Sequence, residues 1–228
     1  MTDLSNIRYI ISDWDGTLSD SWPDYLAAFC KLMEEKFGVD PDKSKQYYNF
    51  TAGAALSNQI KEAAQKFANT TVEDTIELEN LFWKYQKDLP APPVINGASQ
   101  ALQELKNKGY KIVVWSGTRS DILVDRLVKT DLDKFIDFSI GNVPGSSTQV
   151  KGQGLFAEIA KHLNISTDEL RQKAVVIGDG TGDIKAGREV GCPTIGIPKK
   201  PEDGKVLETA GADFVIQSIK DLPSLLTK

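Results

Sequence analysis

The sequence has few of the residues that build transition-metal and disulfide sites. Its 228 residues include one histidine, His162, and two cysteines, Cys30 and Cys192, which lie far apart in the chain. One histidine excludes a metal site with two histidine ligands, and two cysteines at this spacing make neither a zinc motif nor a disulfide framework. We therefore expect two reduced thiols, and a solvent-facing helix position for His162.

Long apolar runs and an excess of positive charge are also missing. No apolar run approaches the roughly 20 residues that a membrane helix needs, and the stretch "MTDLSNIRYI" has neither the basic segment nor the apolar core of a signal peptide. The formal net charge is -5 at pH 7, whereas general nucleic-acid binders are more often basic. These features predict a cytoplasmic protein with no membrane and no nucleic-acid partner.

The apolar residues that are present gather in short β-rich runs separated by helical patterns. The runs are "YIIS" (9–12), "KIVVWS" (111–116), "FIDFSI" (135–140), "AVVIGD" (174–179), "PTIGI" (193–197) and "DFVIQS" (213–218). Near-continuous apolar runs are typical of strands that are buried on both faces. Their alternation with helices predicts an α/β fold, a Rossmann-like parallel sheet flanked by helices.

One long segment interrupts this alternation. Residues 19–90 contain helical stretches such as "PDYLAAFCKLMEEKFG", "AALSNQIKEAAQKFA" and "TVEDTIELENLFWKYQKDL", and no strand-like run. The proline-rich stretch "PAPPV" follows and favours a hinge. We expect residues 1–18 and 91–228 to form the α/β core, and residues 19–90 to form an inserted all-helical domain.

Polar side chains that can do chemistry stand where the predicted strands end. The sequence "DWDGTL" follows the first strand, "SGT" ends the second, and "GDGTGD" follows the fourth. A lysine precedes a helix between the third and fourth strands. Ligands of such sheets bind beyond the carboxyl ends of the strands, so we expect these side chains at one edge: Asp13, Asp15, Ser116, Lys151, Asp179 and Asp183.

Carboxylates that gather at one point repel one another unless a cation separates them. An oxygen-only ligand set suits Mg²⁺, which keeps several waters and pairs with phosphate groups. One carboxylate can attack phosphorus and form an aspartyl-phosphate, and a second can protonate the leaving group and then activate water. Mg²⁺ and a lysine neutralise charge on the transferring phosphoryl group.

The same motifs resemble those of the haloacid dehalogenase-like hydrolases, in the phosphatase form that keeps the second aspartate. "DWDGTL", Ser116, Lys151 and "VVIGDGTGDIKAGREVG" match the family's four motifs in order, across almost the whole chain. Residues 19–90 lie where that family carries a helical cap. Phosphoglycolate phosphatases and beta-phosphoglucomutases are the most similar branch.

The resemblance implies a role for each of these residues. Asp13 is the nucleophile and a metal ligand. Asp15 is the acid/base, and its backbone carbonyl also binds the metal. Asp179 binds Mg²⁺, and Asp183 binds it directly or through water. Ser116, Gly117 and Lys151 hold the phosphoryl group. Trp14 stands where phenylalanine or leucine is usual in the family, and strand alternation points its side chain away from both aspartates.

Simpler interpretations exist for several of these residues. An Asp-x-Asp-Gly sequence alone is more often a turn or part of a calcium loop. Asp183 is also the kind of residue that favours a helix N-terminus. Lys173 is a rival to Lys151, but it precedes the amino end of a strand, which is the wrong edge. The four motifs together favour the catalytic interpretation.

The helical segment carries the least information about chemistry. It contains no arginine, the residue best suited to grip a second phosphate group, so a phosphatase is favoured over a phosphomutase. We expect the specificity surface near its middle, at Asn49, Thr51, Ser57, Asn58, Gln59 and Lys61. The hypothesis is a Mg²⁺-dependent phosphatase for a small phosphorylated metabolite, monomeric or homodimeric. The alternatives are a phosphomutase and a non-catalytic binding protein on the same fold.

Overall fold

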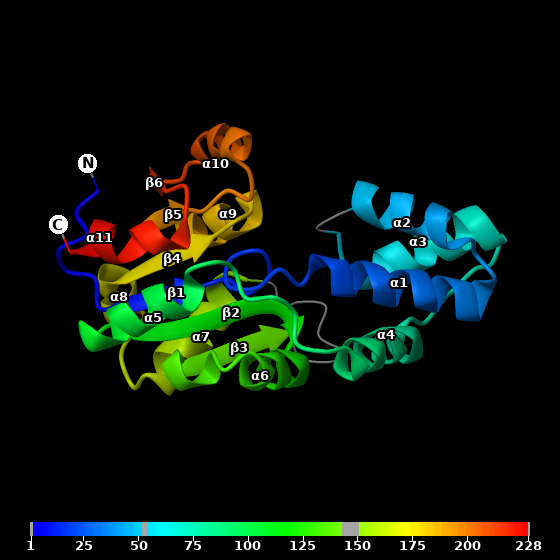
Figure 1. Cartoon of the computed structure of the whole chain (residues 1–228), viewed down its shortest axis with the longest axis horizontal. Helices are drawn as coiled ribbons and strands as arrows, with labels where there is room; N and C mark the ends of the chain where they lie inside the picture. Colours follow the sequence, from blue (N-terminus) through cyan, green and yellow to red (C-terminus); the bar gives the residue numbers. More distant parts are fainter. Residues whose placement is uncertain (1, 52–53, 143–150, 228) are drawn as a thin grey trace. The chain divides into compact units, whose positions relative to one another are not determined.

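The structure is a computed structural model that describes residues 2–51, 54–142 and 151–227. The chain forms two compact units (Figure 1). The first comprises Met1–Asp20 with Pro92–Lys228, and the second comprises Ser21–Ala91. Among the described residues, no helix is both long and apolar enough to cross a membrane.

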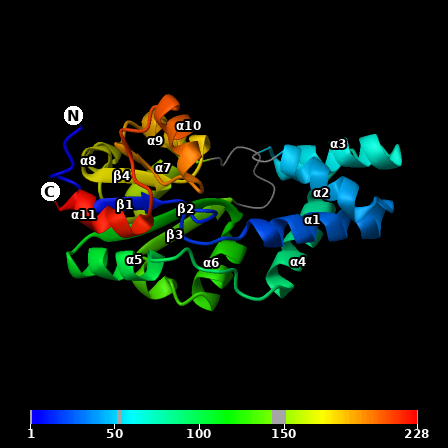
Figure 2. The same cartoon turned by 45° about the horizontal axis from the view of Figure 1, so that its top comes forward.

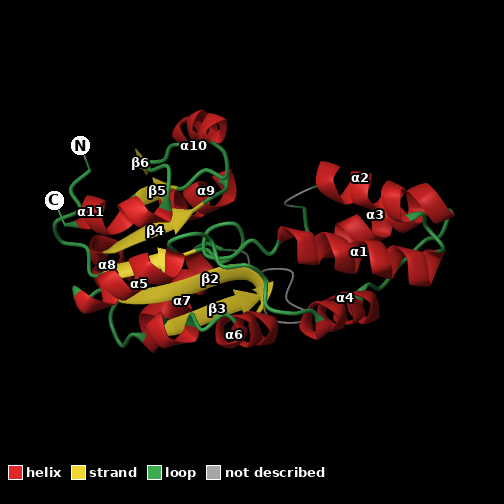
Figure 3. Cartoon of the chain, viewed as in Figure 1, coloured by secondary structure: helices red, strands yellow, loops and turns green. Residues whose placement is uncertain are grey.

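The first unit is built on a six-stranded sheet in which every paired strand is parallel (Figure 3). The predicted parallel α/β fold is therefore confirmed. The strands are β1 (Tyr9–Ser12), β2 (Lys111–Arg119), β3 (Phe138–Asn142), β4 (Ala174–Gly178), β5 (Thr194–Gly196) and β6 (Phe214–Val215).

Helices cover both faces of this sheet. They are α5 (Ala98–Asn107), α6 (Ser120–Lys129), α7 (Gln153–His162), α8 (Thr167–Lys173), α9 (Thr181–Val190), α10 (Gly204–Thr209) and α11 (Leu222–Leu226). Short 3-10 turns at Asp133–Phe135, Pro201–Asp203 and Ile219–Asp221 join some of them. Figure 2 shows α5 and α6 on one side of the sheet, and α7, α8 and α9 on the other.

The sheet is buried on both faces because successive side chains point in opposite directions. Ile10 packs into the core cluster formed with α5, α6 and α11, and its neighbour Ile11 packs into the cluster formed with α7, α8 and α9. Val114 and Trp115 of β2 divide in the same way. This is why the strand sequences are continuous apolar runs. Trp14 is fully buried in the first cluster, on the side that strand alternation predicts.

The strand order is β3-β2-β1-β4-β5-β6. The chain builds outward from β1 through β2 to β3, and then returns to place β4 on the other side of β1. Ser12, at the end of β1, lies in register with Val114 and with Ile177. The carboxyl ends of β1, β2 and β4 are therefore neighbours, at the point where the strand order reverses and where sheets of this type bind ligands.

Two strands differ from their predicted bounds for a physical reason. The second strand continues past Ser116 to Arg119 through a bulge, because its pairing with β3 jumps from Trp115–Ile140 to Arg119–Asn142. The third strand was expected over residues 135–140, but Phe135 closes a 3-10 turn and the strand begins at Phe138. In both cases the partner strand, rather than the local sequence, decides where pairing starts and stops.

The second unit contains four helices in its described residues: α1 (Trp22–Phe37), α2 (Pro41–Phe50), α3 (Leu56–Ala68) and α4 (Ile76–Asp88). They share a core of buried aromatic and aliphatic residues, in which Phe29 stacks on Tyr48 at 4.6 Å between ring centroids. Helix α2 is absent from the predicted stretches because its sequence is mostly polar. Its start is nevertheless marked, since Asp40 caps the backbone N–H groups of residues 42 and 43 and Pro41 stands at the first turn.

Candidate active site

Three carboxyl groups, two of them buried and one partly buried, form the centre of the site. Asp13 directly follows β1, Asp179 directly follows β4, and Asp183 lies in the first turn of α9. One oxygen from each carboxyl group lies within 4.8 Å of the others. Asp13 and Asp183 are 3% and 4% exposed. Carboxylates so buried need nearby positive charge, because removing an ion from water is costly unless it is paired.

Lys151 supplies part of that charge. Lys151 lies two residues before the start of α7. Its Nζ lies 2.5 Å from Asp13 Oδ1 and 2.7 Å from Asp183 Oδ1. The ammonium thus lies between the end of β1 and the start of α9. The rival Lys173 instead pairs with Glu169 of its own helix and precedes the amino end of β4.

Two glycines allow the carboxylates to approach one another. A Cβ added at Gly178 would lie 2.3 Å from the Cβ and Cγ of Asp183, so only glycine leaves room for that side chain. Gly16 has a φ of +85°, and a Cβ there would lie 2.5 Å from Asp179 Oδ2. Asp183 also accepts the backbone N–H of Gly180 through Oδ2. Asp183 therefore caps α9 with Oδ2 and contacts Lys151 with Oδ1. Capping the helix does not prevent its contact with the site.

The acidic cluster is electrostatically strained. Burial raises the pKa of Asp13 well above its usual range, and the neighbouring charge of Asp183 raises it further, while Lys151 opposes both effects. Burial likewise raises the pKa of Asp179, and the nearby Lys199 opposes that rise. For Lys151, burial favours a lower pKa, but Asp13 and Asp183 outweigh it and raise the pKa. For both Asp13 and Asp179, burial thus outweighs the effect of the nearby lysine on the pKa.

The donor set fits a hard divalent cation. Asp13, Asp179 and Asp183 bring three carboxyl groups together, and Lys151 and Lys199 contact them. The three carboxyl groups that could hold a metal ion offer oxygen atoms, which suit Mg²⁺ and do not suit soft metals.

Asp15 is held by hydroxyl groups of β2. Its Oδ2 accepts hydrogen bonds from Ser116 Oγ at 2.9 Å and from Thr118 Oγ1 at 2.8 Å. The backbone N–H of Thr118 donates to Ser116 Oγ at 2.9 Å. Gly117, between them, is exposed, and its carbonyl accepts from Asn142 Nδ2 at 2.6 Å. Of the residues expected to hold substrate or protons, Asp15 and Ser116 are thus in contact, and Lys151 contacts Asp13 instead.

Sequence reasoning missed two polar side chains of the site. Thr118 is one: it stands in the "SGT" that ends the second strand, but Ser116 was the one hydroxyl expected in the site. Lys199 is the other: its Nζ lies 3.0 Å from Asp179 Oδ2, and it reaches there from the loop after β5. The signal that could have found Lys199 is its place just beyond the carboxyl end of a fifth parallel strand. Thr17 adds a weaker contact, with Oγ1 3.3 Å from Asp179 Oδ1.

The predicted specificity residues lie in the second unit, around the end of α2 and the start of α3. Gln59 is buried and donates through Nε2 to the carbonyl and the hydroxyl of Thr51, so these two side chains hold the two helices together. Asn49 is exposed and accepts from Trp22 Nε1 at 3.2 Å. Asn58 and Lys61 are exposed, and Ser57 is half-buried. The exposed members remain predictions for substrate contact.

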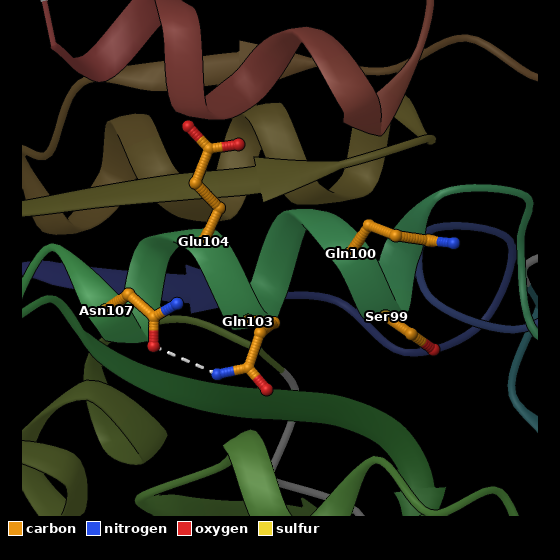
Figure 4. A pocket seen from close by; sticks show the side chains of 5 residues that line it. All are labelled: Ser99, Gln100, Gln103, Glu104 and Asn107. Carbon is orange, nitrogen blue, oxygen red and sulfur yellow. Dashed lines mark hydrogen bonds between the residues drawn. The ribbon is translucent and has the colours of Figure 1, made fainter.

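A shallow surface depression lies elsewhere, along one side of α5 (Figure 4). Ser99, Gln100, Gln103, Glu104 and Asn107 line it, all from that single helix. Gln103 Nε2 donates to Asn107 Oδ1 at 3.0 Å within it. Because all of its lining residues come from one exposed helix face, we attach no chemistry to this depression.

Comparison with known proteins agrees with the geometry. The family model "Haloacid dehalogenase-like hydrolase" matches residues 10–197. A phosphoglycolate phosphatase from Aquifex aeolicus is 30% identical over 193 residues, which cover 82% of this chain and 83% of the relative. The pyrophosphatase PpaX from Listeria innocua is 28% identical over 220 residues, which cover 96% of both chains.

Solved structures show the same fold. A predicted phosphoglycolate phosphatase from Haemophilus somnus superposes with a TM-score of 0.80 at 17% identity, covering 99% of this chain and 100% of that one. A putative beta-phosphoglucomutase from Thermotoga maritima gives 0.71 at 20% identity, covering 97% and 99%. The family model spans most of the chain and includes the aspartates at the ends of β1 and β4. The chain therefore belongs to the haloacid dehalogenase-like hydrolase family, and it is an enzyme of the phosphatase type.

Proposed function

We propose that the protein is a Mg²⁺-dependent phosphomonoester hydrolase that acts on a small phosphorylated metabolite through an aspartyl-phosphate. The observation that carries this proposal is the buried cluster at the switch point of the sheet. There Asp13, Asp179 and Asp183 gather around one spot, Lys151 contacts two of them, and Asp15 stands two residues from Asp13.

In the first step, a carboxylate oxygen of Asp13 attacks the phosphorus atom of the monoester. The bond between phosphorus and the ester oxygen breaks, and Asp15 delivers a proton to that oxygen, so the alcohol leaves neutral. We assign Lys151 to an oxygen of the phosphoryl group, and this assignment is supported by the 2.5 Å between its Nζ and Oδ1 of the attacking Asp13. Ser116 and the backbone N–H of Gly117 are assigned to the other phosphoryl oxygens.

In the second step, Asp15 acts as a base. It takes a proton from a water molecule whose oxygen attacks the phosphorus, the bond to Asp13 breaks, and inorganic phosphate is released. Asp13 is then a free carboxylate again, and Asp15 again carries the proton it needs for the next turnover. One aspartate thus handles the proton in both directions, while the other carries the phosphoryl group.

The proposed metal ligands are Asp13, the backbone carbonyl of Asp15, Asp179 and, directly or through water, Asp183. Bound there, Mg²⁺ supplies positive charge beside the transferring phosphoryl group and lowers the repulsion between phosphate and carboxylates. The raised pKa of Asp13 in the protein alone is consistent with this set, since a nearby cation favours the ionised carboxylate that the first step requires.

We propose that residues 19–90 act as a cap that selects the substrate, with Asn49, Thr51, Ser57, Asn58, Gln59 and Lys61 as its specificity region. The absence of arginine in this segment of the sequence favours a substrate with a single phosphate group over the bisphosphate intermediates of a mutase. The phosphoglycolate phosphatases among the relatives support a small, acidic phosphomonoester as the first compound to test.

The experiment is a measurement of phosphate release from a panel of phosphorylated two- to six-carbon metabolites, with Mg²⁺ and with a chelator in its place. We expect Mg²⁺-dependent release that is strongest for one compound, and none from the Asp13→Asn variant, whose amide is not a nucleophile. Release by Asp13→Asn at the wild-type rate would refute the nucleophile assignment. Isomerisation of a sugar phosphate without release would show that the protein is a phosphomutase.

A further inference from the structure

Asp15 Oδ2 accepts two hydroxyl hydrogen bonds, and the proposed mechanism uses only one of these hydroxyls. Ser116, 2.9 Å away, is assigned to the phosphoryl group by resemblance to the family. Thr118, 2.8 Å away, has no assigned role. Both side chains are buried, with Ser116 fully buried and Thr118 2% exposed. A buried hydroxyl aimed at a reacting carboxylate is a candidate for a role in catalysis.

Each hydroxyl has a single proton to donate. The two differ because the proposed mechanism uses the proton of Ser116, and not that of Thr118, to bind the phosphoryl group. Ser116 Oγ already accepts the backbone N–H of Thr118, and its one O–H proton points at Asp15 in this structure. When Ser116 donates that proton to a phosphoryl oxygen, its hydrogen bond to Asp15 is lost. Thr118 keeps its own hydrogen bond to Asp15 throughout the exchange.

The backbone around Thr118 is fixed before any substrate arrives. The bulge in β2 places five residues, Trp115 to Arg119, opposite three residues of β3, Ile140 to Asn142. A Cβ added at Gly141 would lie 2.1 Å from the carbonyl oxygen of Thr118, so glycine is required for this close approach. Ser120 Oγ bonds both the N–H and the carbonyl of Gly141. Bulges of this kind re-aim side chains next to active sites.

We propose that Thr118 is the positioning residue for the acid/base Asp15. Its hydroxyl donates to Oδ2 and holds the carboxyl group in one orientation, so that the other oxygen, Oδ1, exchanges the proton with the ester oxygen and then with water. The proposal rests on the proposed function, since it gives Thr118 a role only through the proton transfers of Asp15.

The test compares two esters of nearly equal size, phenyl phosphate and p-nitrophenyl phosphate, in the presence of Mg²⁺. The kcat/KM value reports the first step, in which the ester bond breaks. Phenolate is the poorer leaving group, so cleavage of phenyl phosphate depends more on a positioned acid. Loss of a hydrogen bond to a charged group corresponds to about 10- to 100-fold in rate. We expect Thr118→Val to lower kcat/KM for phenyl phosphate by about that factor. The factor by which it lowers kcat/KM for p-nitrophenyl phosphate is expected to be at least about five times smaller.

Three further variants separate positioning from a general loss of structure. Thr118→Ser keeps the hydroxyl and is expected to retain activity within about threefold of the wild type. In an Asp15→Asn background, Thr118→Val is expected to cause no further loss on p-nitrophenyl phosphate, because residues that act as a unit are not additive. Thr194→Val is the matched control. It removes another buried threonine hydroxyl that bonds a carboxylate, Asp213 Oδ2 at 3.0 Å, at the amino end of β5.

The outcomes are distinct. Equal losses on both esters, a full additional loss in the Asp15→Asn background, or no recovery in Thr118→Ser would each overturn the positioning role while leaving the phosphatase assignment intact. The positioning role would also be overturned if Thr194→Val lowered kcat/KM more for phenyl phosphate than for p-nitrophenyl phosphate, by the same ratio as Thr118→Val. A wild-type protein that releases no phosphate from either ester would instead remove the proposed function, and this inference with it.

Discussion

Replacing Lys151 with methionine removes an ammonium group that lies between two buried carboxylates. Its Nζ is 2.5 Å from Asp13 Oδ1 and 2.7 Å from Asp183 Oδ1, and only 18% of the lysine side chain is exposed. Removing one partner of a buried ion pair costs about 3–5 kcal/mol, because the remaining charge is uncompensated. For a chain of this size we expect a fall in melting temperature of roughly 6–20 °C.

The loss of stability in Lys151→Met depends on pH. Lys151 holds the pKa of Asp13 down against burial and Asp183, so the variant has an even higher Asp13 pKa. A carboxyl group with a raised pKa in the folded state contributes stability below its unfolded pKa, and this is lost as the pH rises through the folded pKa. The destabilisation is therefore expected to be larger at about pH 8 than at about pH 5.

The assay is urea unfolding followed by circular dichroism, in chelator, for the wild type and for two lysine variants. Lys173→Met is the matched control, because Lys173 forms a half-exposed pair with Glu169 at 2.9 Å whose loss costs at most about 1 kcal/mol. A loss in Lys151→Met no larger than in Lys173→Met, or one that is independent of pH, would refute the reasoning about the buried cluster.

Two more predictions concern neighbours of the cluster. Gly178→Ala is expected to lower the free energy of unfolding by about 1–3 kcal/mol, because the new Cβ would overlap Asp183. For the same reason, the variant is expected to lose most of its phosphate release. Gly182→Ala is its control: a Cβ there meets nothing within 4 Å, so urea unfolding is expected to show no loss. Lys199→Met removes a positive charge beside a proposed metal ligand, and titration calorimetry is expected to show Mg²⁺ binding tightened about three- to tenfold. Unchanged or weaker binding, or the same gain in Lys200→Met, would contradict this.

Much of the first unit follows from local sequence. Its strands are buried on both faces, so they appear as apolar runs, and parallel strands bring their carboxyl ends to one edge. Asp13 and Asp179 were predicted to meet there, and the structure places them in one cluster with Asp183. Lys151 was predicted at the same edge, and it contacts two of the three.

The missed residues depend on contacts that are distant in sequence. Thr118 belongs to the site only because β3 supports a bulge in β2, with Gly141 in close approach. Lys199 reaches Asp179 from a loop after β5 that carries no motif of its own. Helix α2 is polar along most of its length and is stabilised by packing of Tyr47 and Tyr48 into the second core, which helical periodicity of apolar residues does not reveal.

The most direct test of the central claim is to identify the residue that carries the phosphoryl group. Asp15→Asn lacks the base of the second step, so with p-nitrophenyl phosphate and Mg²⁺ it is expected to accumulate the phosphorylated enzyme. Borohydride reduces an acyl phosphate to an alcohol, which converts an aspartyl-phosphate to homoserine, and mass spectrometry of peptides then locates the change. We expect it at Asp13 and only after incubation with substrate. Release of p-nitrophenol with no change at Asp13, or with a change at another aspartate, would contradict the account.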